Sequence, residues 1–219
     1  MKVKLFVSLL MSFAMAAAVS AQPYGGPGYY PGAGPGMMQR APVADAERLL
    51  RKGVAEMVAF IEAGGTGDEQ KTLAFLNAKI APYFDFPYMA KWVAGARYRY
   101  MSEAERSELT AWVQDMLMST MARNITSYKG QKIHYRPQRS RDGKLVTVSA
   151  WLAEGNRYPT KLDFRFYLSD DGWKVYDVSV SGISLVTNYR STFGNIIREK
   201  GMDSLIRQLT DRNNGKTDG

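Results

Sequence analysis

The 219-residue sequence contains no cysteine and a single histidine, His134. The absence of cysteine excludes disulfides, thiolate nucleophiles, cysteine-ligated metals and attachment through a lipid-modified cysteine. With one histidine and no cysteine, a metal site would have only oxygen ligands to draw on. The stability of the folded protein must come from its own core, because no disulfide can contribute to it.

The chain also lacks complete motifs for nucleotide binding, for a nucleophilic serine and for calcium binding. The chain has no G-x-x-x-x-G-K-[ST] sequence, which a phosphate-binding loop for nucleotides requires. The closest approach to the G-x-S-x-G nucleophile motif, GISLV at 182–186, lacks the final glycine. The sequence DDG at 170–172 lacks the further carboxylates of a calcium loop, and we interpret it as part of a hairpin turn.

The N-terminal segment is predicted to be a secretory signal that is cleaved near Ala21. Lys2 and Lys4 precede an apolar run at 5–19, and VSA at 19–21 supplies the small residues that signal peptidase requires. A membrane anchor is the weaker alternative, because about 20 apolar residues are needed to span a bilayer and this run is shorter. The mature protein is therefore expected to be soluble outside the cytoplasm.

The remaining chain divides by composition into a leader, one folded domain and a tail. Residues 22–41 are predicted to be a flexible leader, since QPYGGPGYYPGAGPG at 22–36 offers too little apolar surface to offset its ordering entropy. The folded domain is assigned to 42–213 and a disordered tail to 214–219. Without the two signal lysines, 27 basic residues face 21 acidic ones. The net charge of +6 suits an anionic partner, while the lack of a long basic cluster argues against nucleic acid.

Four segments have the three- and four-residue apolar spacing of a helical face. They are 44–63, 68–81, 185–200 and 203–212. The longest helix is predicted to begin at Ser102, where Glu105 completes an S-x-x-E capping box, and to end at Gly130. Its apolar stripe is Leu109, Trp112, Val113, Met116, Leu117, Met121, Ile125 and Tyr128.

After residue 130 the apolar period changes to 2, which indicates β-strands. The predicted strands are 131–137, 144–153, 159–169 and 172–180. The third alternates between a polar and an apolar face along Lys161, Leu162, Asp163, Phe164, Arg165 and Phe166. Helices followed by strands and then helices predict an α+β fold, with a curved antiparallel sheet of about four strands and helices packed over it.

His134 and Asp177 are the two residues that we examine for acid–base chemistry. His134 lies in an alternating basic strand and is interpreted as a surface or edge-strand residue. Asp177 interrupts the apolar strand at 172–180, where burial would raise its pKa and make it a candidate general base. We favour a structural acid paired with an arginine such as Arg190. No second catalytic group is evident in the sequence.

Aromatic residues are concentrated at 84–100, and the chain has 12 methionines. Packing in an ordinary core accounts for most of them. The same residues would also suit an adaptable apolar cavity. Composition alone leaves a filled core and an open cavity as alternatives.

Several motifs, in a fixed order behind the signal, resemble a known family. They are FDF at 84–86, the capping box at 102–105, GWKVYDV at 172–178, GISLV at 182–186, NYRSTF at 188–193 and GMDSLI at 201–206. Over 83–209 the chain is similar to the MlaC family, the periplasmic phospholipid-binding component also described as a toluene-tolerance or ABC-transport auxiliary protein. The leader at 22–41 is not part of that pattern.

The resemblance implies a periplasmic carrier with phospholipid as cargo, no cofactor and no enzymatic activity. Such a carrier exchanges phospholipid between an outer-membrane lipoprotein–porin complex and an inner-membrane ATP-driven complex with an MCE-domain subunit, and so maintains outer-membrane lipid asymmetry. Acyl chains are expected in an apolar cavity between the curved sheet and the helices, with the headgroup toward water.

Candidate residues for the cavity come from the sheet, the longest helix and the segment at 183–193. The expected wall residues are Trp112, Met116, Met121, Leu162, Phe164, Phe166, Val178, Val180, Ile183, Leu185, Val186, Tyr189 and Phe193. Lys91, Arg97 and Arg99 are candidates for contact with an anionic headgroup or partner, although ordinary solvated charges explain them equally well. The alternatives are an exported enzyme that uses Asp177 on a small substrate, and an envelope adaptor without a cavity.

Overall fold

The computed structural model describes residues 43–139, 144–154, 157–201, 204 and 207. The predicted signal, the leader at 22–41, the tail at 214–219 and most of the predicted helix at 203–212 lie outside the described residues. The description below therefore concerns the compact unit that begins at Pro42.

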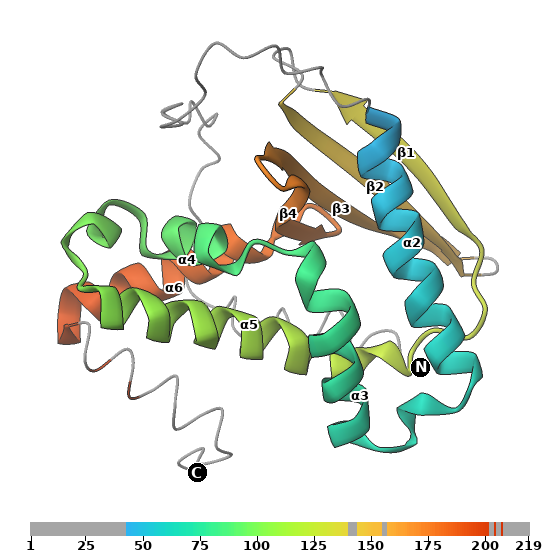
Figure 1. Ribbon diagram of the computed structural model, residues 1–219, viewed down its shortest axis with the longest axis horizontal. Coiled ribbons are helices and arrows are strands. Elements are labelled where there is room, and N and C mark those ends of the chain that lie inside the picture. Colours follow the sequence, from blue (N-terminus) through green and yellow to red (C-terminus); the bar gives the residue numbers. More distant parts are fainter. Residues whose placement is uncertain (1–42, 140–143, 155–156, 202–203, 205–206, 208–219) are drawn as a thin grey trace. The chain divides into compact units, whose positions relative to one another are not determined.

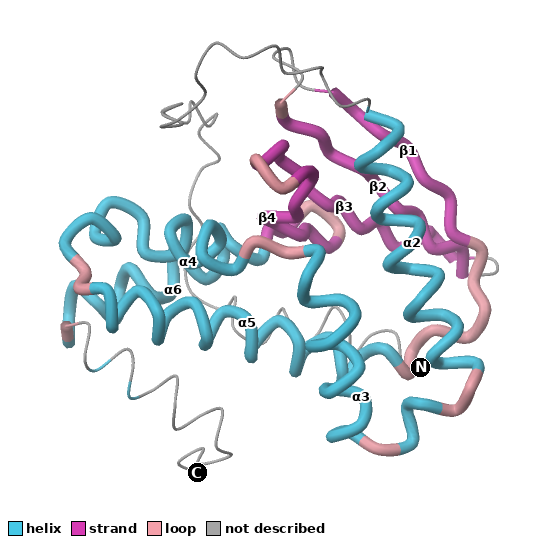
Figure 2. Tube along the Cα trace, in the orientation of Figure 1, coloured by secondary structure: helices cyan, strands magenta, loops and turns pink. Residues whose placement is uncertain are grey.

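This unit contains a five-stranded antiparallel sheet (Figures 1 and 2). Its strands are β1 (Ile133–Arg139), β2 (Leu145–Glu154), β3 (Arg157–Ser169), β4 (Gly172–Val180) and β5 (Ile183–Ser184), paired in sequence order. The four predicted strands are confirmed. The two-residue β5 was not predicted, because two residues carry no periodicity. Ser181 and Gly182 form the β4–β5 turn, both with positive φ angles of 50° and 88°.

The register of the strands gives the sheet an apolar and a polar face. Residues directly opposite one another in an antiparallel pair lie on the same face. The apolar face consists of Tyr135, Val146, Val148, Ala150, Leu162, Phe164, Phe166, Val175, Val178 and Val180. The polar face includes Ser149, Lys161, Asp163, Arg165, Asp177 and Ser179. The alternation predicted for the third strand is therefore confirmed.

Helical segments precede and follow the sheet. Those before it are α2 (Val43–Glu62), η1 (Gly65–Gly67), α3 (Glu69–Phe75), the π-helical turn η2 (Leu76–Ile80), η3 (Ala81–Tyr83), α4 (Phe86–Ala94), η4 (Gly95–Tyr100) and α5 (Glu103–Ile125). The last is α6 (Leu185–Lys200). The predicted capping box is present, because Ser102 and Glu105 accept each other's backbone N–H groups at the start of α5.

Three helical predictions need correction. The segment predicted as one helix at 68–81 divides into α3, η2 and the start of η3. The longest helix ends at Ile125, before the predicted stop at Gly130, so Tyr128 lies in the following loop and not on the helix. Helix α4 was not predicted, although Asp85 caps it by accepting the Tyr88 N–H at 2.8 Å and Pro87 occupies its first turn.

The helices contact the sheet in two ways. Helix α2 packs across β1 and β2, as Figure 1 shows, and the Arg51 guanidinium lies 4.1 Å from the centre of the Tyr135 ring on the apolar face. Helix α4 packs on both α5 and α6, and α4 and α6 both contact β4. The chain at Phe84 and Asp85 pairs with Val175, which fixes the start of α4 to the sheet.

Candidate functional site

The sheet candidates lie together on the apolar face. Leu162 is opposite Val180, and Phe164 is opposite Val178. Phe166, Val178 and Val180 are buried, with 1%, 8% and 7% exposure. Leu162 and Phe164 are only partly covered. The apolar face is thus sealed by protein at some positions and accessible at others.

The apolar face of helix α2 is likewise buried at some positions and partly exposed at others. Ala46 and Leu50 near its start are buried. The later members, which remain partly exposed, are Val54, Met57, Val58 and Ile61. Four consecutive apolar positions on one helical face would normally be enclosed in a filled core. Since α2 packs across the sheet, partly exposed apolar side chains come from both partners of this interface.

The candidates from α5 and α6 form a second group around Trp112. The Trp112 ring lies 4.5 Å from the Phe193 ring and 6.0 Å from the Tyr189 ring, in edge-to-face geometry. Phe193 is buried, while Trp112 and Tyr189 are partly exposed. Such aromatic pairs add about 0.5–1.5 kcal/mol each beyond their buried area. These rings therefore hold α6 against α5.

The other candidates differ in exposure. Leu185 and Val186 are buried at the start of α6, and Met116 and Met121 are partly exposed on α5. Ile183 in β5 is 41% exposed, among the few large apolar side chains in the described segments with so much accessible surface. For each of these residues, a position in the wall of the lipid cavity remains a proposal.

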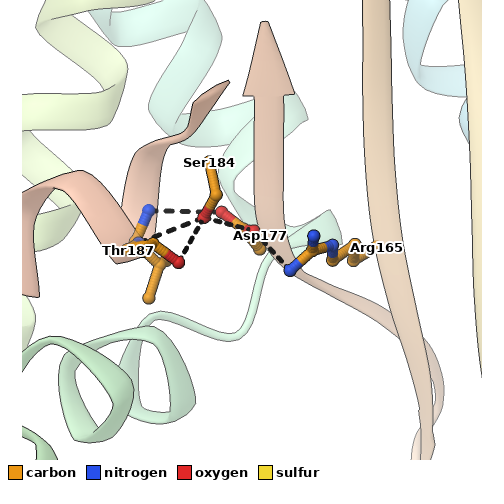
Figure 3. Close-up of polar contacts among 5 residues, drawn as sticks. Arg165, Asp177, Ser184 and Thr187 are labelled. Carbon is orange, nitrogen blue, oxygen red and sulfur yellow. Dashed lines mark hydrogen bonds and ion pairs between the residues drawn. The ribbon is translucent and has the colours of Figure 1, made fainter. Parts of the chain in front are cut away.

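Asp177 is buried on the polar face of β4, and its carboxylate joins three elements (Figure 3). Its Oδ2 accepts from the Ser184 hydroxyl at 2.7 Å, and its Oδ1 accepts from the Val186 N–H at 3.2 Å. Arg165 Nη1 on β3 lies 3.3 Å from Oδ2. Burial raises the pKa of Asp177, and the hydrogen bonds from Ser184 and Val186 and the charge of Arg165 partly oppose that rise. The carboxylate thus ties β5 and the first turn of α6 to the sheet.

The prediction that Asp177 is a structural acid agrees with this geometry, but its suggested partner was wrong. Arg165, its cross-strand neighbour, is the paired arginine. Arg190 instead lies beside Gly95, where a Cβ would be 3.1 Å from Arg190 Nε and 3.2 Å from Nη2. The strand register decides the pairing, and sequence chemistry alone could not.

The candidate cations lie on α4 and η4. Lys91, Arg97 and Arg99 are all exposed. Arg106 on α5 holds η4 in place, since its Nε donates to the Tyr98 carbonyl at 3.1 Å and its guanidinium lies over the Tyr98 ring. Tyr100 at the end of η4 is 78% exposed.

Other chemistry has little support in the described part of the chain. His134 is exposed on the edge strand β1, as predicted. Within the described ranges, no group of three or more histidine, cysteine or acidic residues is placed to hold a metal ion. Among the described helices, none is both long and apolar enough to cross a bilayer.

Comparison with known proteins identifies the family. The family model described as "MlaC protein" matches residues 52–211, well over half of the chain. The chain belongs to the MlaC family. Its resemblance to that family, read from motifs such as GWKVYDV at 172–178, is therefore confirmed.

Individual MlaC-type relatives agree in sequence and in fold. The chain is 23% identical over 134 residues to the intermembrane phospholipid transport system binding protein MlaC of Haemophilus influenzae. That match covers 59% of this chain and 63% of the relative, so the chain spans less than two thirds of the relative's length. A solved phospholipid-binding protein from Ralstonia solanacearum, in complex with a phospholipid, is 26% identical with a TM-score of 0.70. The alignment covers 78% of this chain and 98% of that structure, which confirms the α+β fold with a curved sheet.

One set of residues in the candidate site of this MlaC-family chain was not predicted from the sequence. The α2 residues Val54, Met57, Val58 and Ile61 have the helical spacing that predicts a helix at 44–63, but the predicted cavity wall does not include them. Their spacing is the same whether the stripe meets protein or ligand. Only their partial exposure in the folded chain adds them to the site.

Proposed function

We propose that this chain is a periplasmic phospholipid carrier that binds acyl chains between the apolar face of the sheet and the helices. The single observation that carries the proposal is its likeness to the Ralstonia solanacearum protein, nearly all of which is matched and which is solved with a phospholipid. The name of the Haemophilus influenzae relative, which refers to phospholipid transport, supports the same class of function.

The partly exposed apolar side chains support this location for the lipid. Helix α2 packs against the sheet through β1, β2 and β4. Leu162 and Phe164 on the sheet and the Val54–Ile61 stripe on α2 are nevertheless only partly buried. Covering such surface is favourable at about 25 cal/mol per Å² of apolar area. Hydrocarbon chains would provide that cover without any polar partner.

The energetics suit a carrier that takes lipid from one apolar site and delivers it to another. At about 0.8 kcal/mol per buried methylene, a lipid with roughly 30 methylenes gains on the order of 24 kcal/mol over exposure to water. Spontaneous release into solvent is therefore negligible. Transfer from a bilayer to the protein is nearly neutral, so the direction must be set by the partners.

The proposed partners follow from the family. They are an outer-membrane lipoprotein–porin complex and an inner-membrane ATP-driven complex with an MCE-domain subunit. Between them the protein would cross the periplasm, after cleavage of the signal near Ala21, and help to maintain outer-membrane lipid asymmetry. No cofactor and no catalytic step are part of the proposal. Asp177 is held by Ser184, Val186 and Arg165, which supports a structural role for it.

The decisive experiment is organic extraction of the mature protein followed by mass spectrometry. We expect about one phospholipid per chain, or uptake of that amount from labelled vesicles if purification removes the lipid. A preparation that neither contains nor takes up lipid would refute the carrier and favour an adaptor. Turnover of a small apolar substrate that is abolished by Asp177→Asn would favour the enzyme instead.

A further inference from the structure

The Arg190 guanidinium has no carboxylate partner in the part of the chain that the structure describes. It was expected to pair with Asp177, but Arg165 occupies that carboxylate at 3.3 Å. No ion pair or hydrogen bond joins the Arg190 side chain to any described residue. The side chain is nevertheless partly buried on α6. The C-terminal end of α4 favours a cation there, and the donors that remain exposed are available to an anion.

The guanidinium lies against the end of α4, where Gly95 makes room for it. A Cβ at position 95 would lie 3.1 Å from Nε, 3.2 Å from Nη2 and 3.3 Å from Cζ of Arg190. The three similar distances mean that the planar group lies across the glycine and does not point at it. Gly95 has a φ of 60° and ψ of −135°, which a residue with a side chain rarely adopts. The backbone thus leaves a place that the guanidinium fills.

Further positive charge lies on the segments that flank Gly95 in the sequence. The Lys91 carbonyl accepts the Gly95 N–H, so Lys91 lies one turn earlier on α4. Arg97 and Arg99 follow on η4 and are exposed. Positions 86–102 contain these three cations and no acidic residue. With Arg190 on α6, the junction of α4, η4 and α6 therefore presents cations from three elements, and positions 86–102 contribute no carboxylate to neutralise them.

We infer that Arg190, with Lys91, Arg97 and Arg99 on the adjoining α4 and η4, binds the phosphate group of the cargo lipid. The guanidinium has a planar fork of N–H donors that matches a phosphate in a bidentate arrangement. One face rests on Gly95, so the orientation of the fork is fixed before the anion arrives. The inference rests on the proposed carrier function and adds which group recognises the phosphate.

Paired ligands that differ only in phosphate test this inference. The probes are a fluorescent phosphatidylglycerol and a diacylglycerol with the same acyl chains, bound to the delipidated mature protein. Arg190→Gln should weaken phosphatidylglycerol binding by about tenfold, the usual loss for a charge-assisted hydrogen bond, and leave diacylglycerol binding unchanged. Arg198→Gln is the matched control, since Arg198 lies on the same helix, is exposed and bonds Asn195. It should change neither affinity.

The outcomes separate the possible roles of Arg190. Equal losses for both ligands, or no loss for either, would overturn the phosphate site while the wild type still binds lipid. If the wild type binds neither ligand, the carrier proposal itself fails. Competition by millimolar inorganic phosphate that disappears in Arg190→Gln would support the site and show that it also accepts the free anion. A lowered melting temperature with unchanged affinities would mean that Arg190 only stabilises the end of α4 and does not bind phosphate.

Discussion

Phe164 and Phe166 are two residues apart on the same face of β3, and they give the sharpest test of where lipid binds. Phe166 is 1% exposed, opposite buried Val146 and Val175. Phe164 is partly exposed although its neighbours Val148 and Val178 are buried. The chemistry of the two substitutions to alanine is identical. Their consequences should differ because only one ring is already enclosed by protein.

For Phe166→Ala we expect a loss of about 3–5 kcal/mol in the free energy of unfolding, the cost of an emptied site in a filled core. For Phe164→Ala the loss should be smaller, about 1–2 kcal/mol, because part of its surface is accessible in the folded chain without lipid. Chemical denaturation of delipidated protein measures both values. Lipid binding should show the reverse order, with Phe164→Ala weakening it by about tenfold.

A third variant makes the test stricter. Phe164→Glu places a carboxylate where the acyl chains are proposed to lie, and a buried unpaired charge is strongly unfavourable there. A folded Phe164→Glu protein should be purified without phospholipid. If folded Phe164→Glu retains lipid, or if Phe164→Ala is as destabilising as Phe166→Ala, then Phe164 is an ordinary core residue and the lipid lies elsewhere.

Three further predictions concern the scaffold. Because burial raises the pKa of Asp177, its contribution to stability is greatest below its unfolded pKa and is lost as pH rises from about 4 through the raised folded value. The loss of unfolding free energy caused by Asp177→Asn, measured by chemical denaturation, should therefore be larger at pH 4 than at pH 7. The opposite trend would mean that the ion pair with Arg165 outweighs desolvation. Ser102→Ala removes the side-chain cap of α5 and should lower stability by about 1 kcal/mol, whereas an unchanged melting temperature would show that the exposed cap contributes nothing. Gly194→Ala in α6 meets no atom within 4 Å and should raise stability by about 0.5–1 kcal/mol; a decrease would indicate that the helix is strained at that position.

The elements that sequence analysis predicted correctly are those with a long, clear period. Strands β1 to β4 alternate over seven or more residues, and their face assignment follows from the alternation. Helix α4 was missed because Phe86, Tyr88 and Trp92 were read as an aromatic concentration and not as helical spacing. The cap at Asp85 and Pro87 was the available signal. The break at η2 has no such signal, since 76–80 retains helical spacing while its hydrogen bonds change to a π pattern.

For the candidate site, the sequence identified residue types but not whether protein or ligand buries each side chain. Trp112, Tyr189 and Phe193 were assigned to a cavity wall, and the structure brings their three rings into mutual contact. Whether a side chain faces protein or ligand depends on contacts between segments far apart in the chain. Helical or strand spacing reports which face a residue lies on, and it reports nothing about what covers that face.

Arg165 and Arg190, two possible partners of Asp177 by charge, illustrate this limit and its consequence. Arg165 and Arg190 are equally suitable partners by charge, and the sequence offers no ground to choose between them. The β3–β4 register places Arg165 opposite Asp177, so this pair is fixed by strand pairing. Arg190 follows the turn at Gly182 and the start of α6, which direct it toward Gly95 instead. The structure pairs Asp177 with Arg165, and it places Arg190 against Gly95, at the boundary between α4 and η4. A phosphate at that junction would give Arg190 the anionic partner that no described carboxylate supplies.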